Sequence, residues 1–130
     1  MRRLSCITLA VWALATVAHA ETLSVGPGKR FATPCEAVAQ ASPRDVIEIA
    51  AGTYTDSCVL DAAGLTLRGV GSRPKIDLSG TDHPAQYKAI YVVAAADITV
   101  ENLELTGAHV SDANGANAAA LRIEAAGLRV

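Results

Sequence analysis

The sequence predicts an all-β solenoid, a chain wound into coils of short strands, with one short helix before the coils. The main observation is a repeated plan of strand, small-residue turn and strand, found at residues 59–67, 90–100 and 121–130. The turns end in Gly64, Asp97 and Gly127, which are 33 and 30 positions apart. A near-constant spacing with about three strands per unit is typical of a solenoid, in which each coil buries its apolar edges against its neighbours. A β-sandwich also uses short strands but does not require such a repeat.

The helix is predicted over Pro34–Gln40. Thr33 can cap its N-terminus, Pro34 suits the first helical position, and Glu36 can complete a capping box. Ser42 and Pro43 then end the helical pattern.

Everything after Asp45 is predicted as short strands separated by turns, because brief apolar alternations are bounded by Gly or Asp. The expected strands are 46–49, 58–60, 65–67, 75–78, 89–93, 98–100, 103–105, 121–123 and 128–130, with a turn at 51–54. Two loops, 79–88 and 106–119, each precede the first strand of a repeat, so we expect them to project from the same edge. Asn102 suits a sharp corner because Asn tolerates left-handed backbone.

The first twenty residues have the order of a secretory signal peptide. Arg2 and Arg3 precede an apolar run from residue 7 to 18, and Ala18 and Ala20 are small residues at −3 and −1. Cleavage after Ala20 predicts a secreted or periplasmic mature chain, residues 21–130. The apolar run is shorter than the roughly twenty residues that a membrane span needs, so we expect no span in the mature chain.

The mature chain has nine Lys and Arg residues against thirteen Asp and Glu. Without a basic cluster, nucleic acid is not expected as a partner. Cys35 and Cys58 form an even pair, which suits a disulfide in an oxidising compartment, although two buried thiols fit the sequence as well. His83 and His109 lack ligand-like spacing to them, so no metal site is predicted.

The resemblance of the sequence to a known family rests on three stretches: Val46–Tyr54, Leu65–Gly71 and Ile98–Leu105. The first two resemble the opening of pectin-lyase-like right-handed parallel β-helix proteins, and the third is similar to the strand pair with an asparagine corner in pectate lyases. This resemblance, which extends over nearly all of 21–130, implies that the predicted helix caps the N-terminal end. It also implies that carbohydrate lies where the long loops meet the first strand of each coil, and it makes calcium a possible cofactor, although none is evident in the sequence.

The catalytic glutamine, aspartates and arginine of pectinesterases would lie on coils beyond residue 130, so the catalytic residues are left unknown. The solenoid is therefore expected to be incomplete at its C-terminus. Since Val130 falls inside a strand, we expect an open β edge and self-association of this segment alone.

Candidate substrate-binding residues follow from alternation along the first strand of each repeat. Ile90 and Val92 should point inward and Tyr91 outward, and Leu121 and Ile123 inward with Arg122 outward. The predicted binding residues are Tyr91, Arg122, Glu124, Lys88 and His109, and the loops add His83, Tyr87, Asp112, Asn114 and Asn117. An aromatic face, cations and amides suit a sugar or uronate. The same residues could also be an ordinary solvated surface, and Asp112-Ala-Asn114-Gly115 fits a tight turn better than a calcium loop.

Two functions remain open from the sequence. One is an exported β-helix protein directed at polysaccharide, a lyase or esterase whose catalytic coils lie beyond residue 130, so that this part alone would be inactive. The other is a non-catalytic glycan-binding or structural module of the cell envelope.

Overall fold

The computed structural model describes residues 10–13, 19–81 and 83–130. The predicted signal peptide, residues 1–20, lies mostly outside these ranges. Across the described ranges, no helix is both long and apolar enough to cross a membrane.

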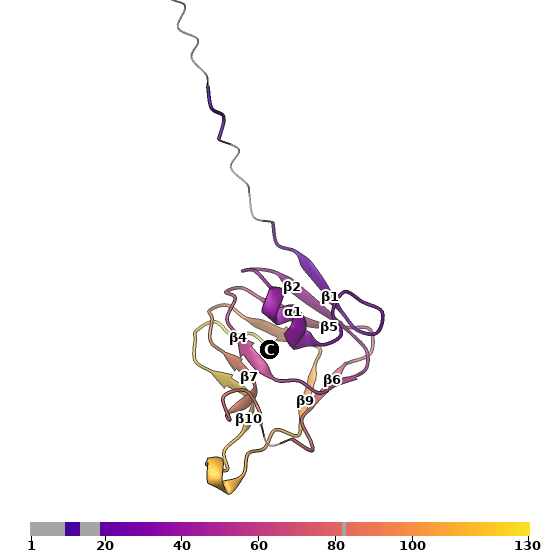
Figure 1. The fold of residues 1–130 in the computed structure, drawn as a ribbon, viewed down its shortest axis with the longest axis vertical. Helices are drawn as coiled ribbons and strands as arrows, with labels where there is room; N and C mark the ends of the chain where they lie inside the picture. Colours follow the sequence, from indigo (N-terminus) through magenta and orange to yellow (C-terminus); the bar gives the residue numbers. More distant parts are fainter. Residues whose placement is uncertain (1–9, 14–18, 82) are drawn as a thin grey trace, which may run out of the picture.

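One α-helix, α1 (Pro34–Gln40), and ten short strands make up the described chain (Figure 1). The strands are β1 (Thr22–Val25), β2 (Val46–Ala50), β3 (Thr53–Tyr54), β4 (Cys58–Leu60), β5 (Thr66–Val70), β6 (Lys75–Asp77), β7 (Ala89–Val93), β8 (Thr99–Glu101), β9 (Glu104–Thr106) and β10 (Ala119–Ile123). The strands predicted after Asp45 are present with ends shifted by at most three residues, except for the last. Residues 128–130 form no strand, and only Arg129 makes an isolated bridge, to Thr99.

The strands form three sheets in the orders β1-β2-β5-β8, β3-β6-β9 and β10-β7-β4. Within the described ranges, all these strands pair in parallel, and each coil from β2 onward contributes one strand to each sheet. Equivalent apolar residues therefore stack coil upon coil, as in the row Ile47, Leu67 and Val100. The three sheets surround one core, so the predicted parallel solenoid is confirmed.

The N-terminal strand β1 was not predicted. It pairs with β2, and its Leu23 and Val25 are buried beside Ile47 and Ile49. The alternation Thr-Leu-Ser-Val that buries every second residue was visible in the sequence. It was missed because the segment has only four residues and no repeat partner of its own.

The predicted bounds of α1 are confirmed. The Thr33 hydroxyl accepts a hydrogen bond from the Glu36 N–H at 3.4 Å, and the Glu36 carboxylate accepts one from the Ala32 N–H at 2.9 Å. The carboxylate thus reaches one residue before the cap residue, a variation on the expected capping box. The helix buries Pro34, Ala37 and Val38 and packs against β1, β2 and β4, so it covers the N-terminal end of the solenoid.

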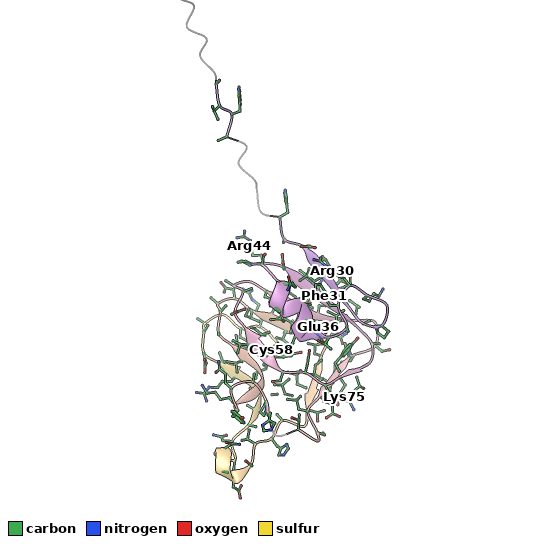
Figure 2. The ribbon with its side chains drawn as sticks, in the orientation of Figure 1. Arg30, Phe31, Glu36, Arg44, Cys58 and Lys75 are labelled. Carbon is green, nitrogen blue, oxygen red and sulfur yellow. A yellow bond between two sulfur atoms is a disulfide. The ribbon has the colours of Figure 1, made fainter. Side chains whose placement is uncertain are left out.

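An exposed ion pair lies near the N-terminal end of the chain's fold. The Arg30 guanidinium pairs with the Glu21 carboxylate and lies 5.0 Å from the centre of the Phe31 ring (Figure 2). Both charged groups are more than half exposed, so the ion pair contributes little to stability.

The repeated turns have left-handed backbone, since φ is +72° at Gly64, +60° at Asp97 and +84° at Gly127. Asn102 is also left-handed (φ +52°), and its side-chain amide donates a 2.8 Å hydrogen bond to the Gly69 carbonyl of the preceding coil. A Cβ on Gly69 would come within 2.1 Å of the Asn102 carbonyl oxygen. The corners of adjacent coils thus approach so closely that Gly69 cannot carry a side chain.

Candidate functional site

The candidate site lies where the two long loops enter β7 and β10. These strands are parallel neighbours, and the Ala119 N–H donates to the Lys88 carbonyl at 2.9 Å, so the loop ends lie side by side. The buried side of loop 79–88 is fixed by Ser57, whose hydroxyl accepts from the Ala85 N–H at 2.6 Å and donates to the Ile90 carbonyl at 2.7 Å. The preceding coil therefore positions the loop that carries Lys88.

Tyr91 is not at this surface, and its predicted outward orientation is wrong. Its side chain is fully buried in the core, in a cross-coil row with Cys58 and Leu121. Val92, which was predicted to point inward, is in the row of Arg122 on the other side of the strand. Because all five residues of β7 are apolar and buried, alternation within the strand gives no sign of which side faces the core.

Three of the predicted residues do come together. The Glu124 Oε1 atom lies 3.1 Å from the Lys88 Nζ and 3.7 Å from the Arg122 Nε. Lys88 precedes β7, whereas Arg122 is in β10 and Glu124 follows it, so two consecutive coils supply the group. We call Lys88, Arg122 and Glu124 the cationic strip. The Lys88 Nζ also lies 3.4 Å from the Gln86 side-chain oxygen.

An exposed aromatic side chain adjoins the cationic strip in the chain. Tyr87 is 48% exposed, and its ring meets the His83 ring edge-on with 5.6 Å between their centres. Gln86 and Tyr87 both have left-handed backbone, with φ +53° and +55°. The Tyr87 N–H donates to the Pro84 carbonyl at 2.9 Å, which closes this turn. Tyr87, and not Tyr91, is the aromatic residue that a ligand could reach.

His109 is exposed, and among the described residues it has no hydrogen bond or ion pair to the cationic strip. Further along the same loop, Asp112–Asn114 form one 3₁₀ turn that ends at Gly115 with φ +98°. This is a tight turn. Within the described ranges, no three His, Cys, Asp or Glu side chains cluster as a metal site would require.

A second polar group lies under α1, away from the strip. The Cys35–Cys58 disulfide, with 5.9 Å between its Cα atoms, joins α1 to β4. Next to it, the Asp56 Oδ2 accepts a 2.7 Å hydrogen bond from the Cys35 N–H. The Asp56 Oδ1 and the Tyr91 hydroxyl are buried and have no hydrogen-bond partner among the residues that the structure describes. Burial raises the pKa of Asp56, and burial together with the Asp56 charge raises the pKa of Tyr91. The sequence did not predict that Asp56 would be buried beside the disulfide.

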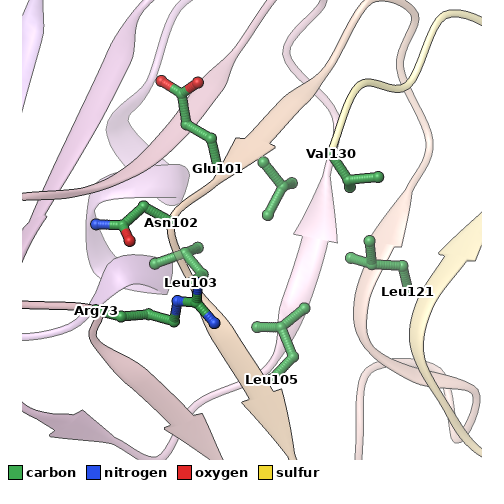
Figure 3. Close-up of a pocket in the computed structure, with 8 residues that line it drawn as sticks. Arg73, Glu101, Asn102, Leu103, Leu105, Leu121 and Val130 are labelled. Carbon is green, nitrogen blue, oxygen red and sulfur yellow. The ribbon is translucent and has the colours of Figure 1, made fainter.

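Cavities also lie outside the strip. One, of about 470 Å³, opens at the C-terminal end of the solenoid between Leu103, Leu105, Leu121 and Val130, with Arg73 at its edge (Figure 3). The other, of about 430 Å³, lies near the N-terminal end and is lined by residues 26–29, 32–33 and 53–55. The first is mostly apolar because leucine side chains that pack against the core line it.

Comparisons with known proteins identify the fold. No protein-family model matches this sequence, and no curated protein matches it. The crystal structure of the pectin methylesterase from Aspergillus niger in deglycosylated form matches with a TM-score of 0.52 and 23% sequence identity. The match covers 87% of this chain and 44% of that one, so this chain spans less than half the length of the matched enzyme. Together with the all-parallel sheets, this likeness shows that the chain folds as a right-handed parallel β-helix.

Proposed function

We propose that this chain belongs to an exported β-helix protein that binds acidic polysaccharide, and that the cationic strip is its contact surface. The observation that carries the proposal is the convergence of Lys88 and Arg122, from consecutive coils, on one exposed surface. The fold supports the class of ligand, because the matched structure is an enzyme named for pectin. The signal-peptide pattern of residues 1–20 supports export.

The chemistry of the strip suits a uronate chain. Arg122 offers a planar guanidinium that can pair with a carboxylate through two parallel hydrogen bonds, and Lys88 adds a point charge. Both cations are roughly half exposed, at 54% and 42%. Lys88 lies just before β7, whereas Arg122 is opposite Val92 in the next coil, so the two charges are offset along the strands and can contact different carboxylates of one polymer. The exposed Tyr87 ring provides an apolar face for a sugar.

A non-catalytic binding module is the second candidate, and the ion pairing of Glu124 favours it. Glu124 is the one carboxylate of the strip, and it is engaged with both cations. A general acid or base needs reach to a substrate proton, whereas in this structure the Glu124 carboxylate is directed at the two cations. In an enzymatic parent, lyase or esterase residues would have to come from outside the strip. Release of methanol or of unsaturated ends from pectin by the protein would indicate an enzyme, and binding without either product would favour the module.

The test of the binding proposal is a calorimetric titration of the 130-residue chain with trigalacturonate. Replacing both Lys88 and Arg122 with Ala should weaken binding about tenfold, because two exposed charge-assisted contacts of about 0.7 kcal/mol each add up to about 1.4 kcal/mol. The matched control is Arg68→Ala. Arg68 is similarly exposed and is paired with Glu101, but it lies on a different sheet. Equal affinity of the double variant and the original chain would contradict the proposal.

A further inference from the structure

We infer that the Glu124 carboxylate competes with ligand carboxylates for Lys88 and Arg122. This competition lowers the affinity of the cationic strip for its ligand and selects for ligands with more than one negative charge. This inference rests on the proposed function, since it assumes that the strip binds acidic sugars. It assigns to Glu124 a role opposite to that of a binding residue. Its removal should strengthen binding.

The position of the Glu124 carboxylate carries the inference. One oxygen, Oε1, is shared between the Lys88 Nζ at 3.1 Å and the Arg122 Nε at 3.7 Å. A carboxylate between two cations is the arrangement that an anionic ligand would adopt on the same surface. An incoming uronate carboxylate must therefore displace Glu124 or share the cations with it.

The exposure of the three side chains makes this displacement feasible. The side chains of Lys88, Arg122 and Glu124 are 42%, 54% and 33% exposed. Ion pairs at such sites are weak because water and salt screen them. The backbone of Glu124 is held independently of its side chain, since its N–H donates to the Val93 carbonyl at 2.9 Å. The carboxylate can thus leave the cations without disturbing β10.

The exchange also predicts a preference for ligands with several charges. A ligand with one carboxylate replaces the Glu124 carboxylate at the same two cations, so the attraction gained is close to the attraction lost. A ligand with neighbouring carboxylates can place one on Lys88 and another on Arg122, and so gains a contact that Glu124 alone does not provide. The strip should therefore bind a de-esterified uronate chain in preference to a single uronate or to a methyl-esterified chain.

The experiment compares the original chain with Glu124→Gln, which keeps the shape of the side chain and removes its charge. Titration with trigalacturonate should show tighter binding by Glu124→Gln, by roughly three- to fivefold, the range of an exposed ion pair. Titration with the fully methyl-esterified trimer should show no gain. The control variant is Glu101→Gln, which removes the carboxylate paired with Arg68 on another sheet and should leave both affinities unchanged.

The outcomes separate this inference from the proposed function. If the original chain binds trigalacturonate and Glu124→Gln binds it no more tightly, the competitor role is wrong and the binding proposal stands. If Glu124→Gln gains equally for the esterified trimer, charge competition is not the cause and the inference is overturned. If neither protein binds the acidic trimer, the proposed function and the inference both fail. Thermal unfolding of both Gln variants should match that of the original chain.

Discussion

At the N-terminal end of the solenoid, α1 covers the first coils (Figure 1). At the other end, which we call the open end, β9 and β10 are the last strands of their sheets, and on that side β8 meets only the isolated bridge from Thr99 to Arg129 among the described residues. Val93 and Ile123 illustrate the difference. They are register partners on adjacent coils, yet Val93 is 0% exposed and Ile123 is 57% exposed. Burial in this fold is therefore decided by the presence of a covering layer and not by the residue or its strand. The binding surface that we propose belongs to neither end, since the cationic strip lies on the side of the stack.

The largest expected difference in the free energy of unfolding is between Ala variants of Ile49 and Ile123. Ile49 lies in the second rung, fully buried, and Ile123 lies in the open rung. Ile49→Ala should lower the free energy of unfolding by about 2–5 kcal/mol, because it leaves a cavity in a packed core, and Ile123→Ala by less than about 1 kcal/mol. Urea unfolding of the two variants measures this difference. Equal losses would show that the open rung is covered in solution.

The disulfide should have the next largest effect. Cys35 and Cys58 are separated by 23 residues, so their bond restricts the unfolded chain. Replacing both with Ala should lower the free energy of unfolding by about 3 kcal/mol. The same variant should lose its response to reducing agent, whereas the original chain should be destabilised by it. An original chain equally stable with and without reductant would contradict the role of this bond at the covered end.

A smaller, pH-dependent effect is expected from Asp56. Because burial raises the pKa of this carboxyl in the folded state, the folded protein holds its proton more tightly than the unfolded chain does. The contribution of Asp56 to stability is therefore fully present below the unfolded pKa and is lost as the pH rises through the folded pKa. The charge of Glu36 also raises the pKa of Asp56, whereas hydrogen bonds from the Cys35 N–H and the Thr33 side chain lower it, and burial is the largest of these influences.

Asp56→Asn should remove this pH dependence and should not lose stability near neutral pH, since the Asn oxygen can still accept from the Cys35 N–H. Urea unfolding of both proteins from pH 4 to 8 measures the effect. Asp61→Asn, at an exposed position beyond β4, is the matched control. If the original chain and Asp56→Asn show parallel pH profiles, Asp56 is not the group responsible.

The sequence predicted features whose causes are local. The start of the helix follows from Thr33 and Pro34. The coil turns need left-handed backbone, which Gly64, Asp97 and Gly127 adopt. The orientation of Tyr91 could not be predicted, because it is set by Cys58 and Leu121, about thirty residues away on either side in the sequence.

The site was predictable only in part for the same reason. Lys88, Arg122 and Glu124 meet because the register of β7 and β10 places them together, and that register is not local information. The burial of Asp56 depends on α1 packing over it. The residues around Asp56 in the sequence therefore could not predict this burial.

The most direct measurement of the central claim, that the side of the stack binds the polysaccharide, is a map of backbone amide NMR shifts during titration with trigalacturonate. The largest shifts should fall on Lys88, Arg122 and Glu124 and on Tyr87 beside them. Little change should occur around Leu103 and the cavity at the open end. Shifts concentrated at that cavity, or spread evenly over the chain, would contradict the claim.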